Sequence, residues 1–568
     1  MDDIRIPSDP LGKIALSCSG GGYRAASFHL GVMAYLQRVQ YQGHPLLDNV
    51  KMLSTVSGGT ITGIVYTLQR QQGKTFPEIY AFLLERLRRL DLVKLGIEKL
   101  NPGAPWRNTY KRKNLINAFA ELYDEHFTGG ATFAALDNMH CHLEAVAFNS
   151  TEFTNAVDFR FRNRGTGFFG NFYFRVSNSQ AGEIRLSDAM AASSCFPGGF
   201  EPIIWPHDFI HDEAPQLAAL AETTTPVGIM DGGIYDNQGI DTILRYKGSL
   251  DDPYFDCIII SDVASPYMNP FKPTPDEDKK GINRITLRQF YHRAKKINQW
   301  INFLLPALCL ILCGLPFAWH YTDNITTGVC LSFACILLLL WILKIKLLRK
   351  ALRLPGQFRN FLVEKNPNMN FYWERLSNLD IGSLSIHRAK PLVLDRLNSL
   401  LSLLLNVFLK VVRRLNYNII YSDDRFRFRR ISTLIRKLTR EDFQAQAGRP
   451  SKDRTAAVLE HSFLKGDYDT VVGPKIAAVA EAAANFGTTL WFTPEDQLTN
   501  TLDKLIATGE FTMCYNLIEY IETLVYNDDF ARLSPEGQTA LKTLLDQCKA
   551  DWLQFQNDPF FLLEKHSS

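Results

Sequence analysis

The sequence predicts an α/β domain with a mainly parallel sheet, then a hairpin of two membrane-length helices, then a mainly helical C-terminal region. Three observations predict this fold class. Up to about residue 275, short apolar strand patterns alternate with helix patterns, which indicates parallel strands covered by helices on both faces in three layers. Two long charge-free runs follow, and leucines and isoleucines then recur at helical spacing. We therefore expect three domains, with the boundaries 1–275, 276–355 and 356–568.

The composition excludes several classes of protein. Hydrophobic residues make up 46% of the 568 residues and charged residues 21%, which is enough apolar material for sizeable cores and excludes wholesale disorder. The net charge is only +3, so the composition does not indicate a nucleic-acid partner. Ten cysteines in a chain of this length exclude a small disulfide scaffold.

The first half of the chain alternates between strand and helix patterns. Lys13–Cys18 is a short apolar run, and a glycine-rich turn separates it from a helix pattern at Ala25–Gln40. A linker is predicted at Pro266–Lys280 from its prolines and charges. Further buried strands are predicted at Val50–Val56, His142–Phe148 and Cys257–Ser261, and a second helix at Thr60–Gln71.

The charge-free runs predict two membrane-spanning helices, at about 300–319 and 325–345. Phe303–Trp319 has seventeen residues and Asn324–Leu343 has twenty, and a helix needs about 20 apolar residues to cross the hydrocarbon core. The loop between them has no lysine or arginine, whereas both flanks are basic, which predicts that both flanking regions are cytoplasmic. The alternative is a buried hairpin of a soluble protein, but the runs lack the polar face that such helices keep. The basic residues are Arg284, Arg288, Arg293, Lys295 and Lys296 before the pair, and Lys344, Lys346, Arg349, Lys350 and Arg353 after it.

Two further patterns lie in the C-terminal region. Leu397–Leu409 is mostly leucine but too short to span a bilayer, so we expect a core helix, with an interfacial helix as the alternative. Arg425–Arg430 alternates arginine with phenylalanine, which predicts a half-exposed strand with its aromatic side chains inward. A basic aromatic stripe on anionic lipid is the alternative for that segment. More helices are predicted at Val472–Asn485, Pro494–Thr508, Phe511–Tyr526 and Ser534–Gln547.

Three glycines follow the first predicted strand. Gly20, Gly21 and Gly22 allow backbone N–H groups to converge, and the helix N-terminus that follows adds positive potential, so the turn is suited to an anion. That anion is either a permanent phosphate or a transient oxyanion. Gly20-x-Gly22-x-x-Ala25 also fits a dinucleotide fingerprint, but the acidic residue expected at the end of the second strand is missing. A P-loop is excluded because no Gly-Lys-Ser/Thr follows.

A serine lies where the second predicted strand meets its helix. Ser57 is followed by Gly58 and Gly59, and small neighbours are what a nucleophile elbow needs, because its serine adopts a strained backbone conformation. The usual G-x-S-x-G has a glycine two residues before the serine, where this chain has Thr55. The alternative is a serine that only caps the following helix.

An Asp-Gly-Gly sequence supplies a candidate base. Asp231 is followed by Gly232 and Gly233, and most Asp-Gly sequences are simply turns. Beside a nucleophilic serine, however, the carboxylate is placed to accept a proton. Burial would raise its pKa and make it a better base near neutral pH.

Four segments occur in the order seen in patatin-like phospholipases, and the chain resembles the bacterial members most. Four segments in order are far more specific than any one of them. The resemblance covers about residues 10–265 and says little about the hairpin or the C-terminal region. The four segments are Leu16–Ala26, Ser54–Gly59, Ala191–Pro197 and Asp231–Asn237.

The resemblance implies a Ser–Asp dyad. Ser57 would attack the ester carbonyl, and Asp231 would accept its proton. The N–H groups of the three glycines would form the oxyanion hole with Arg24 beside them, and each such donor typically lowers the barrier by about 2.7–4 kcal/mol. No metal or organic cofactor is implied. The oxyanion hole is thus expected at Gly20, Gly21, Gly22 and Arg24.

Several further polar residues are interpreted as structural. His29 lies within the first helix and is expected to be packed, because the dyad needs no histidine. Ser193 and Cys195 lie in a small-residue helix end where close packing is expected. Asp188 and Asp236 are expected to support the site or a turn and not to act as catalysts.

The sequence therefore predicts a serine acyl hydrolase anchored in the membrane, with a phospholipid or lysophospholipid ester as substrate. The reaction would pass through an acyl-enzyme that water hydrolyses. Acyl transfer to an alcohol by the same dyad is the alternative, because the sequence does not separate the two. A non-catalytic membrane scaffold and a nucleotide-binding membrane protein are interpretations of a different class. The sequence gives no oligomeric state.

Overall fold

The computed structural model divides the chain into two compact units. One unit joins Met1–Met268 with Leu404–Ser568, and the other is Asn269–Leu403. The described residues from 407 onward therefore share a unit with the N-terminal sheet, whereas the three predicted domain boundaries stay a prediction. Most of the predicted linker lies outside the described residues. The structure describes residues 5–163, 169–248, 253–264, 271–275, 281–318, 324–365, 380–403, 407–447 and 456–563.

The main sheet of the first unit has a parallel centre and an antiparallel side, in the order β12-β11-β1-β4-β5-β6-β7-β8, with β10 and β9 attached beyond β5. The four predicted parallel strands are confirmed at its centre. Its strands are β1 Ile14–Cys18, β4 Val50–Val56, β5 Ala145–Glu152, β6 Val157–Arg162, β7 Phe169–Gly170, β8 Arg175–Val176, β9 Ile203–Trp205, β10 Val227–Asp231, β11 Cys257–Asp262 and β12 Arg430–Leu434. Two short strands, β2 Gln40–Tyr41 and β3 His44–Pro45, form a separate antiparallel pair.

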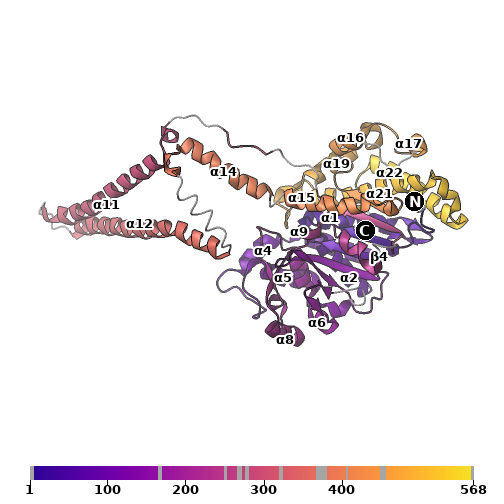
Figure 1. Ribbon diagram of the computed structural model, residues 1–568, viewed down its shortest axis with the longest axis horizontal. Helices are drawn as coiled ribbons and strands as arrows, with labels where there is room; N and C mark the ends of the chain where they lie inside the picture. The colour runs from indigo at the N-terminus through magenta and orange to yellow at the C-terminus, as the bar shows by residue number, and fades with distance from the viewer. Residues whose placement is uncertain are drawn as a thin grey trace. The chain divides into compact units, whose positions relative to one another are not determined.

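Helices of both halves of the chain cover this sheet (Figure 1). In the first unit they are α1 Gly22–Arg38, α2 Gly58–Gln71, α3 Phe76–Arg89, α4 Leu92–Lys99, α5 Leu115–Tyr123, α6 Asn178–Glu183, α7 Leu186–Ser193, α8 Pro215–Thr223, α9 Gly233–Asp236, α10 Ile240–Leu244, α15 Phe408–Ser422, α16 Arg440–Ala447, α17 Ala456–His461, α18 Tyr468–Val471, α19 Gly473–Asn485, α20 Pro494–Leu498, α21 Thr501–Val525 and α22 Pro535–Asn557. The second unit has its own helices, α11 Leu287–Ala318, α12 Asn324–Lys365 and α14 Ile386–Ser402.

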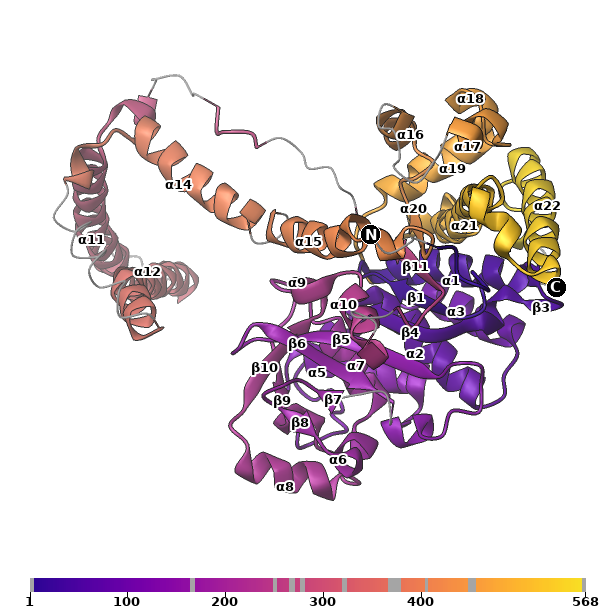
Figure 2. The same ribbon diagram turned by 45° about the vertical axis from the view of Figure 1, so that its right-hand side comes forward.

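The C-terminal region completes the first unit through a strand and a helix. β12 pairs in parallel with β11 and so extends the sheet. α21 lies along α1 (Figure 2), and a Cβ on Gly31 of α1 would be 2.0 Å from the Ile506 carbonyl oxygen. A Cβ on Gly509 of α21 would be 2.1 Å from the Phe28 carbonyl oxygen. Glycine at both positions therefore allows the two helix backbones to approach closely.

The strand predicted at Arg425–Arg430 is wrong. Asp424–Phe426 form a short 3-10 turn, and the strand begins only at Arg430. Phe426 and Phe428 are nevertheless buried, as the alternating pattern predicted. The burial comes from the turn and from the loop that follows it, so side-chain alternation did not identify the backbone conformation.

The second unit contains the predicted hairpin. α11 and α12 lie side by side (Figure 1), and both contain a segment long and apolar enough to cross a membrane. These segments are Leu287–Leu315 and Thr327–Lys346, and their apolar windows are 0% and 6% buried within the structure. A core hairpin of a soluble protein would bury most of this surface, and the two windows are instead exposed within the structure.

The core helix predicted at Leu397–Leu409 is also wrong. α14 has no buried residue, and the leucines at its C-terminal end are about half exposed. α15 begins at Phe408, whose side chain is 55% exposed. Leucines spaced for a buried helix face are spaced equally well for an exposed one, so the pattern alone did not distinguish the two.

Candidate active site

The site forms where two strands meet end to end. Val56 of β4 pairs with Asn149 of β5, which places Ser57 level with Ser150. β10 runs antiparallel to β5 and pairs Asp231 with Ser150. β6 pairs with one edge of β5. Both β4 and β10 therefore pair with the opposite edge of β5, and they meet there. Strand register alone therefore brings the predicted serine and the predicted carboxylate together.

The backbone at the serine is an elbow. Ser57 has φ 52° and ψ −122°, a conformation that costs a non-glycine residue about 1–3 kcal/mol. α2 begins at the next residue, so its N-terminus adds positive potential beside the hydroxyl. A Cβ on Gly58 would lie 2.1 Å from the Gly22 carbonyl oxygen, and one on Gly59 would lie 2.7 Å from that of Cys18. These glycines let the elbow pack directly onto the glycine turn.

The usual elbow motif has a glycine where this chain has Thr55. Gly63, in the second turn of α2, compensates for this departure. A Cβ on Gly63 would lie 2.6 Å from Thr55 Cγ2, so glycine at 63 makes room for the threonine methyl group. The Thr55 hydroxyl is 2.9 Å from that of Thr60, and the two share a hydrogen bond. The helix therefore carries the small residue that the strand lacks, and the elbow still forms.

Ser193 at the end of α7 holds the elbow, which the sequence analysis did not predict. The Ser57 N–H donates to the Ser193 hydroxyl oxygen at 2.9 Å. The Ser193 hydroxyl donates to the Asn149 carbonyl at 2.7 Å and lies 2.8 Å from the Thr60 hydroxyl. Its predicted close packing is confirmed, because it is fully buried, but it also fixes the strained peptide of the candidate nucleophile.

Asp231 combines burial with two hydrogen bonds. Its side chain accepts from the Ser57 side chain and, at 2.7 Å, from the Gly233 N–H. Its own N–H donates to the Cys195 carbonyl at 3.0 Å, which fixes the end of β10. Burial is the largest influence and raises the pKa of Asp231 from 3.8 to about 6, although both hydrogen bonds act to lower it. At pH 7 the group is therefore ionised but is a stronger base than an exposed aspartate.

The two glycines after Asp231 are required by close contacts. A Cβ on Gly232 would lie 2.3 Å from the Asn149 carbonyl oxygen. A Cβ on Gly233 would lie 2.7 Å from Asn237 Oδ1 and 3.0 Å from Asp231 Oδ1. A side chain at 232 would thus clash with the backbone of β5, and one at 233 would press against the carboxylate.

The glycine turn offers two free donors, not three. The Gly20 N–H donates to the Asn237 carbonyl at 3.0 Å, which corrects the expectation that it forms part of an oxyanion hole. A Cβ on Gly20 would lie 3.0 Å from Ser57 Cβ, so its role is to let the turn approach the serine. No acceptor in the described part of the chain takes the N–H groups of Gly21 or Gly22. Both lie at the N-terminus of α1, where positive potential supports an anion.

Arg24 also differs from expectation, because it holds the C-terminal region. Its guanidinium donates to the Phe486 carbonyl at 2.7 Å and to the Thr488 hydroxyl at 3.3 Å. The Tyr23 N–H donates to the Thr489 carbonyl at 2.7 Å. The loop between α19 and α20 therefore caps the start of α1 and fixes the glycine turn from outside. Arg24 is a structural clamp in this conformation, not an oxyanion donor.

Comparison with known proteins was made against protein families, curated proteins and solved structures. The family described as patatin-like phospholipase matches residues 16–244, which contain the glycine turn, the elbow and the Asp-Gly-Gly turn. Residues 16–244 are a patatin-like phospholipase domain.

The solved structures that resemble the chain include two of human GIVD cytosolic phospholipase A2. The first is 13% identical in sequence, with a TM-score of 0.27. The matched region covers 44% of this chain and 42% of the chain of that protein. The second, in complex with methyl gamma-linolenyl fluorophosphonate and terbium chloride, is 15% identical and covers 50% and 44%, also with a TM-score of 0.27. The chain thus spans less than half of the length of those proteins. No curated protein matches it.

The packed interpretation of His29 in the patatin-like domain is confirmed. Its Nδ1 lies 2.6 Å from the Ser261 hydroxyl, and its Nε2 lies 2.9 Å from the Ser19 carbonyl oxygen. Burial lowers its pKa to about 4, so the ring is neutral at pH 7. His29 ties the ends of β1 and β11 together beneath the glycine turn.

The two other buried aspartates that the sequence singled out in this domain have structural partners. Asp188 forms an ion pair with Lys111, and both side chains are buried. Asp236 accepts the N–H groups of Gln238 at 3.1 Å and Asp241 at 2.7 Å, which organises the loop after α9. The expectation that they support the fold is confirmed. Within the described ranges, no group of three or more histidine, cysteine or acidic side chains is arranged to hold a metal ion.

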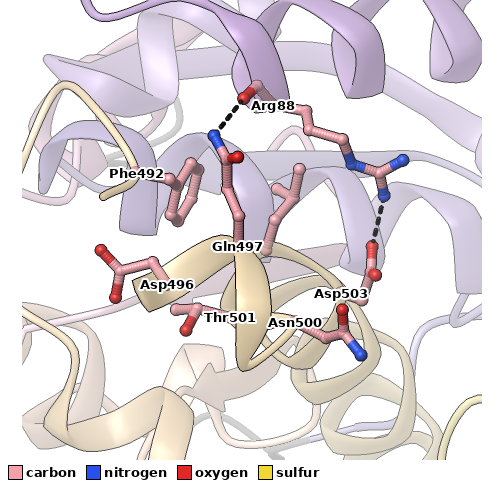
Figure 3. Close-up of a pocket in the computed structure, with 8 residues that line it drawn as sticks. Arg88, Phe492, Asp496, Gln497, Asn500, Thr501 and Asp503 are labelled. Atoms are coloured by element: carbon pink, nitrogen blue, oxygen red, sulfur yellow. Dashed lines mark hydrogen bonds and ion pairs between the residues drawn. The ribbon is translucent and has the colours of Figure 1, made fainter. Parts of the chain in front are cut away.

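A shallow pocket of about 280 Å³ lies between α3 and the α20–α21 turn (Figure 3). Arg88 crosses it, donating to Asp503 at 2.9 Å, and its carbonyl accepts from Gln497 at 3.3 Å. None of the predicted site residues lines it. Arg88 is thus paired with two other lining residues, and the pocket does not identify a ligand.

Proposed function

We propose that the chain hydrolyses fatty-acyl esters of membrane phospholipids or lysophospholipids through a dyad of Ser57 and Asp231. The observation that carries this proposal is the strand register by which the serine elbow and the buried carboxylate come together where β4 and β10 meet. The elbow conformation and the two adjacent helix N-termini support it further.

The arrangement suits a two-step reaction. The Ser57 oxygen attacks the ester carbonyl carbon while its proton passes to Asp231, and the N–H groups of Gly21 and Gly22 stabilise the oxyanion. Collapse of the tetrahedral intermediate breaks the ester bond, and the leaving alcohol takes the proton from Asp231. Water then attacks the acyl-enzyme, again giving a proton to Asp231, and fatty acid is released as the proton returns to Ser57.

We further propose that α11 and α12 anchor the protein in a membrane with both flanking regions in the cytoplasm. The length, apolar character and exposure of the two segments support the anchor. The basic flanks and the loop without lysine or arginine support the orientation. In a background without its ten native cysteines, Asp323→Cys should react with an impermeant thiol reagent only from outside the cytoplasm. Reaction from the cytoplasmic side would reverse the orientation.

The catalytic proposal is tested by fatty-acid release. Full-length protein in mixed phospholipid vesicles should release fatty acid, and Ser57→Ala should lower the rate by about 10⁴-fold or more. A fluorophosphonate probe should label the wild type at Ser57. Ser179→Ala, at an exposed serine of α6, is the matched control and should keep the wild-type rate. An unchanged rate in Ser57→Ala would exclude this nucleophile.

Product analysis separates hydrolysis from acyl transfer. With a lysophospholipid present as an acceptor, hydrolysis gives free fatty acid, whereas transfer gives a new diacyl phospholipid. We expect free fatty acid as the main product. A predominance of the diacyl product that is lost in Ser57→Ala would establish the acyltransferase alternative on the same dyad.

A further inference from the structure

α15 has one face committed to the active-site turns. On this face, the Arg413 guanidinium donates to the buried Asp262 carboxylate at 2.7 Å. Asp262 ends β11, beside the glycine turn. The Asn416 side-chain amide donates to the Tyr235 carbonyl at 3.3 Å, in the turn that follows Asp231. α15 is therefore attached to both sides of the proposed catalytic centre.

The opposite face of α15 is apolar and lacks a covering element among the described residues of its own unit. Four large side chains recur three or four residues apart and so form one stripe along the helix. Such a stripe would normally be buried, because exposing large apolar side chains to water is unfavourable. The side chains and their exposed fractions are Phe408 55%, Val411 42%, Leu415 59% and Ile419 44%.

Charge favours an anionic lipid surface as the occupant of this face. Lys410 and Arg414 lie on α15, and Arg414 is exposed. Apart from Arg413, which is paired with Asp262, residues 386–422 contain five lysines and arginines and one acidic residue, Asp395. A helix with an apolar stripe and basic flanks is suited to lie in the interface of an anionic bilayer. A protein partner would need an acidic surface around an apolar groove, and nothing in the described residues indicates one.

α14 of the second unit repeats the pattern independently. Its apolar side chains, among them Val393 at 65% and Leu400 at 53%, are exposed, and it carries Arg388, Lys390 and Arg396. It follows α12, one of the two helices with a segment able to cross a membrane. If α12 crosses a membrane as proposed, α14 follows a membrane-spanning helix, and a bilayer is then the nearest apolar surroundings for α14.

We propose that the outer face of α15, defined by Phe408, Val411, Leu415 and Ile419, docks on an anionic lipid bilayer. Because the inner face binds the turns at Asp262 and Tyr235, docking brings the active site to the lipid surface. The benefit to catalysis rests on the proposed dyad, and the nearness of a bilayer rests on the proposed membrane anchor.

Photolabelling tests the docking without using activity. Full-length Ser57→Ala protein is reconstituted in vesicles of phosphatidylcholine, with or without phosphatidylglycerol, that contain a phospholipid with a diazirine in its acyl chain. In vesicles with phosphatidylglycerol, we expect label on the peptide 408–419. The label on this peptide should be several-fold weaker in vesicles without phosphatidylglycerol. It should also be several-fold weaker in the double variant Lys410→Glu/Arg414→Glu. The α20 peptide that contains Leu498, 85% exposed in the first unit, should stay unlabelled. Absence of label on 408–419 overturns the proposal, and so does a cross-link of that peptide to a second copy of the chain.

An activity assay tests the consequence for catalysis. Leu415→Glu should lower fatty-acid release from phosphatidylglycerol vesicles by about tenfold or more, because it removes one buried leucine from the docked face. The matched control, Leu498→Glu, should not change this rate, and both variants should hydrolyse a water-soluble short-chain ester at the wild-type rate. An unchanged vesicle rate in Leu415→Glu overturns the docking. If the wild type hydrolyses neither the vesicle lipid nor the soluble ester, the proposed function is contradicted. The docking is then decided by the photolabelling result alone.

Discussion

The serine and the carboxylate of the proposed dyad are held in different ways. Ser57 is fixed by its neighbours: its N–H binds Ser193, and α2 packs onto the glycine turn through Gly58 and Gly59. The pKa of Asp231 is set by its surroundings. Burial outweighs the two hydrogen bonds that the carboxylate accepts and raises its pKa to about 6. The comparison teaches that one half of the site depends on backbone geometry and the other on electrostatics. Substitutions on the two sides should therefore fail in different ways.

The largest effect is expected on the carboxylate side, where activity and stability should move in opposite directions. Asp231→Asn removes the proton acceptor and should lower the rate by about 10⁴-fold, as in acyl-transfer sites that lose a carboxylate. Because folding raises the pKa of Asp231 from 3.8 to about 6, the buried charge destabilises the folded protein above pH 6.

This cost disappears in Asp231→Asn, which should raise the free energy of unfolding at pH 7 by about 1–3 kcal/mol. Below about pH 3 the wild-type group is protonated in both the folded and the unfolded state, so the difference should vanish there. Denaturant unfolding at pH 7 and at about pH 3 measures it. A variant that is less stable at pH 7 would contradict the electrostatic description of this half of the site.

The next effect tests the geometric side. Ser193→Ala removes the acceptor of the Ser57 N–H and should lower kcat by about 10- to 100-fold with little change in KM, because small displacements of a nucleophile are costly. Ser187→Ala, on the same helix, is the control, because its buried hydroxyl has no hydrogen-bond partner in the described structure. Ser193→Thr keeps the hydroxyl and should recover part of the rate. Equal losses in Ser187→Ala and Ser193→Ala would indicate only a packing role.

The local motifs were enough to predict Ser57 and Asp231, because an elbow and an Asp-Gly-Gly turn are encoded by adjacent residues. The supports of the elbow were not predictable in the same way. Ser193 lies 136 positions from Ser57, and Thr489 reaches the glycine turn from the other end of the chain. Nor did the sequence show that Asn237 would take the Gly20 N–H, because turn geometry decides which amide remains free.

The fold shows the same division between local and long-range information. The parallel strands followed from short apolar runs, and the long helices from their periodicity. β12 joined the sheet through pairing with β11, which no local pattern in Arg430–Leu434 specifies. The leucines of α14 were assigned to a core because periodicity identifies the apolar face of a helix. It does not identify what that face contacts.

A moderate effect is expected in the pH dependence. Asp231 must be ionised to accept the serine proton, so kcat/KM should fall about tenfold per pH unit below a pKa of about 6 and level off above it. His29, whose pKa is lowered to about 4 by burial, should not contribute to this limb. Measurement on a soluble ester avoids changes in the lipid surface. A limb near pH 4 would indicate that the carboxylate is more solvated than its burial implies.

The smallest effect is expected from the contact that replaces the missing elbow glycine. Gly63→Ala places a Cβ 2.6 Å from Thr55 Cγ2 and should destabilise the fold by about 1–3 kcal/mol, with a modest loss of activity. Thr55→Ser removes that methyl group but keeps the hydroxyl that meets Thr60. The double variant should therefore recover most of the stability lost in Gly63→Ala. A double-mutant cycle on unfolding measures the coupling. Additive effects would mean that Gly63 does not compensate for Thr55, and the elbow would then owe its shape to Ser193 and the glycines beside Ser57.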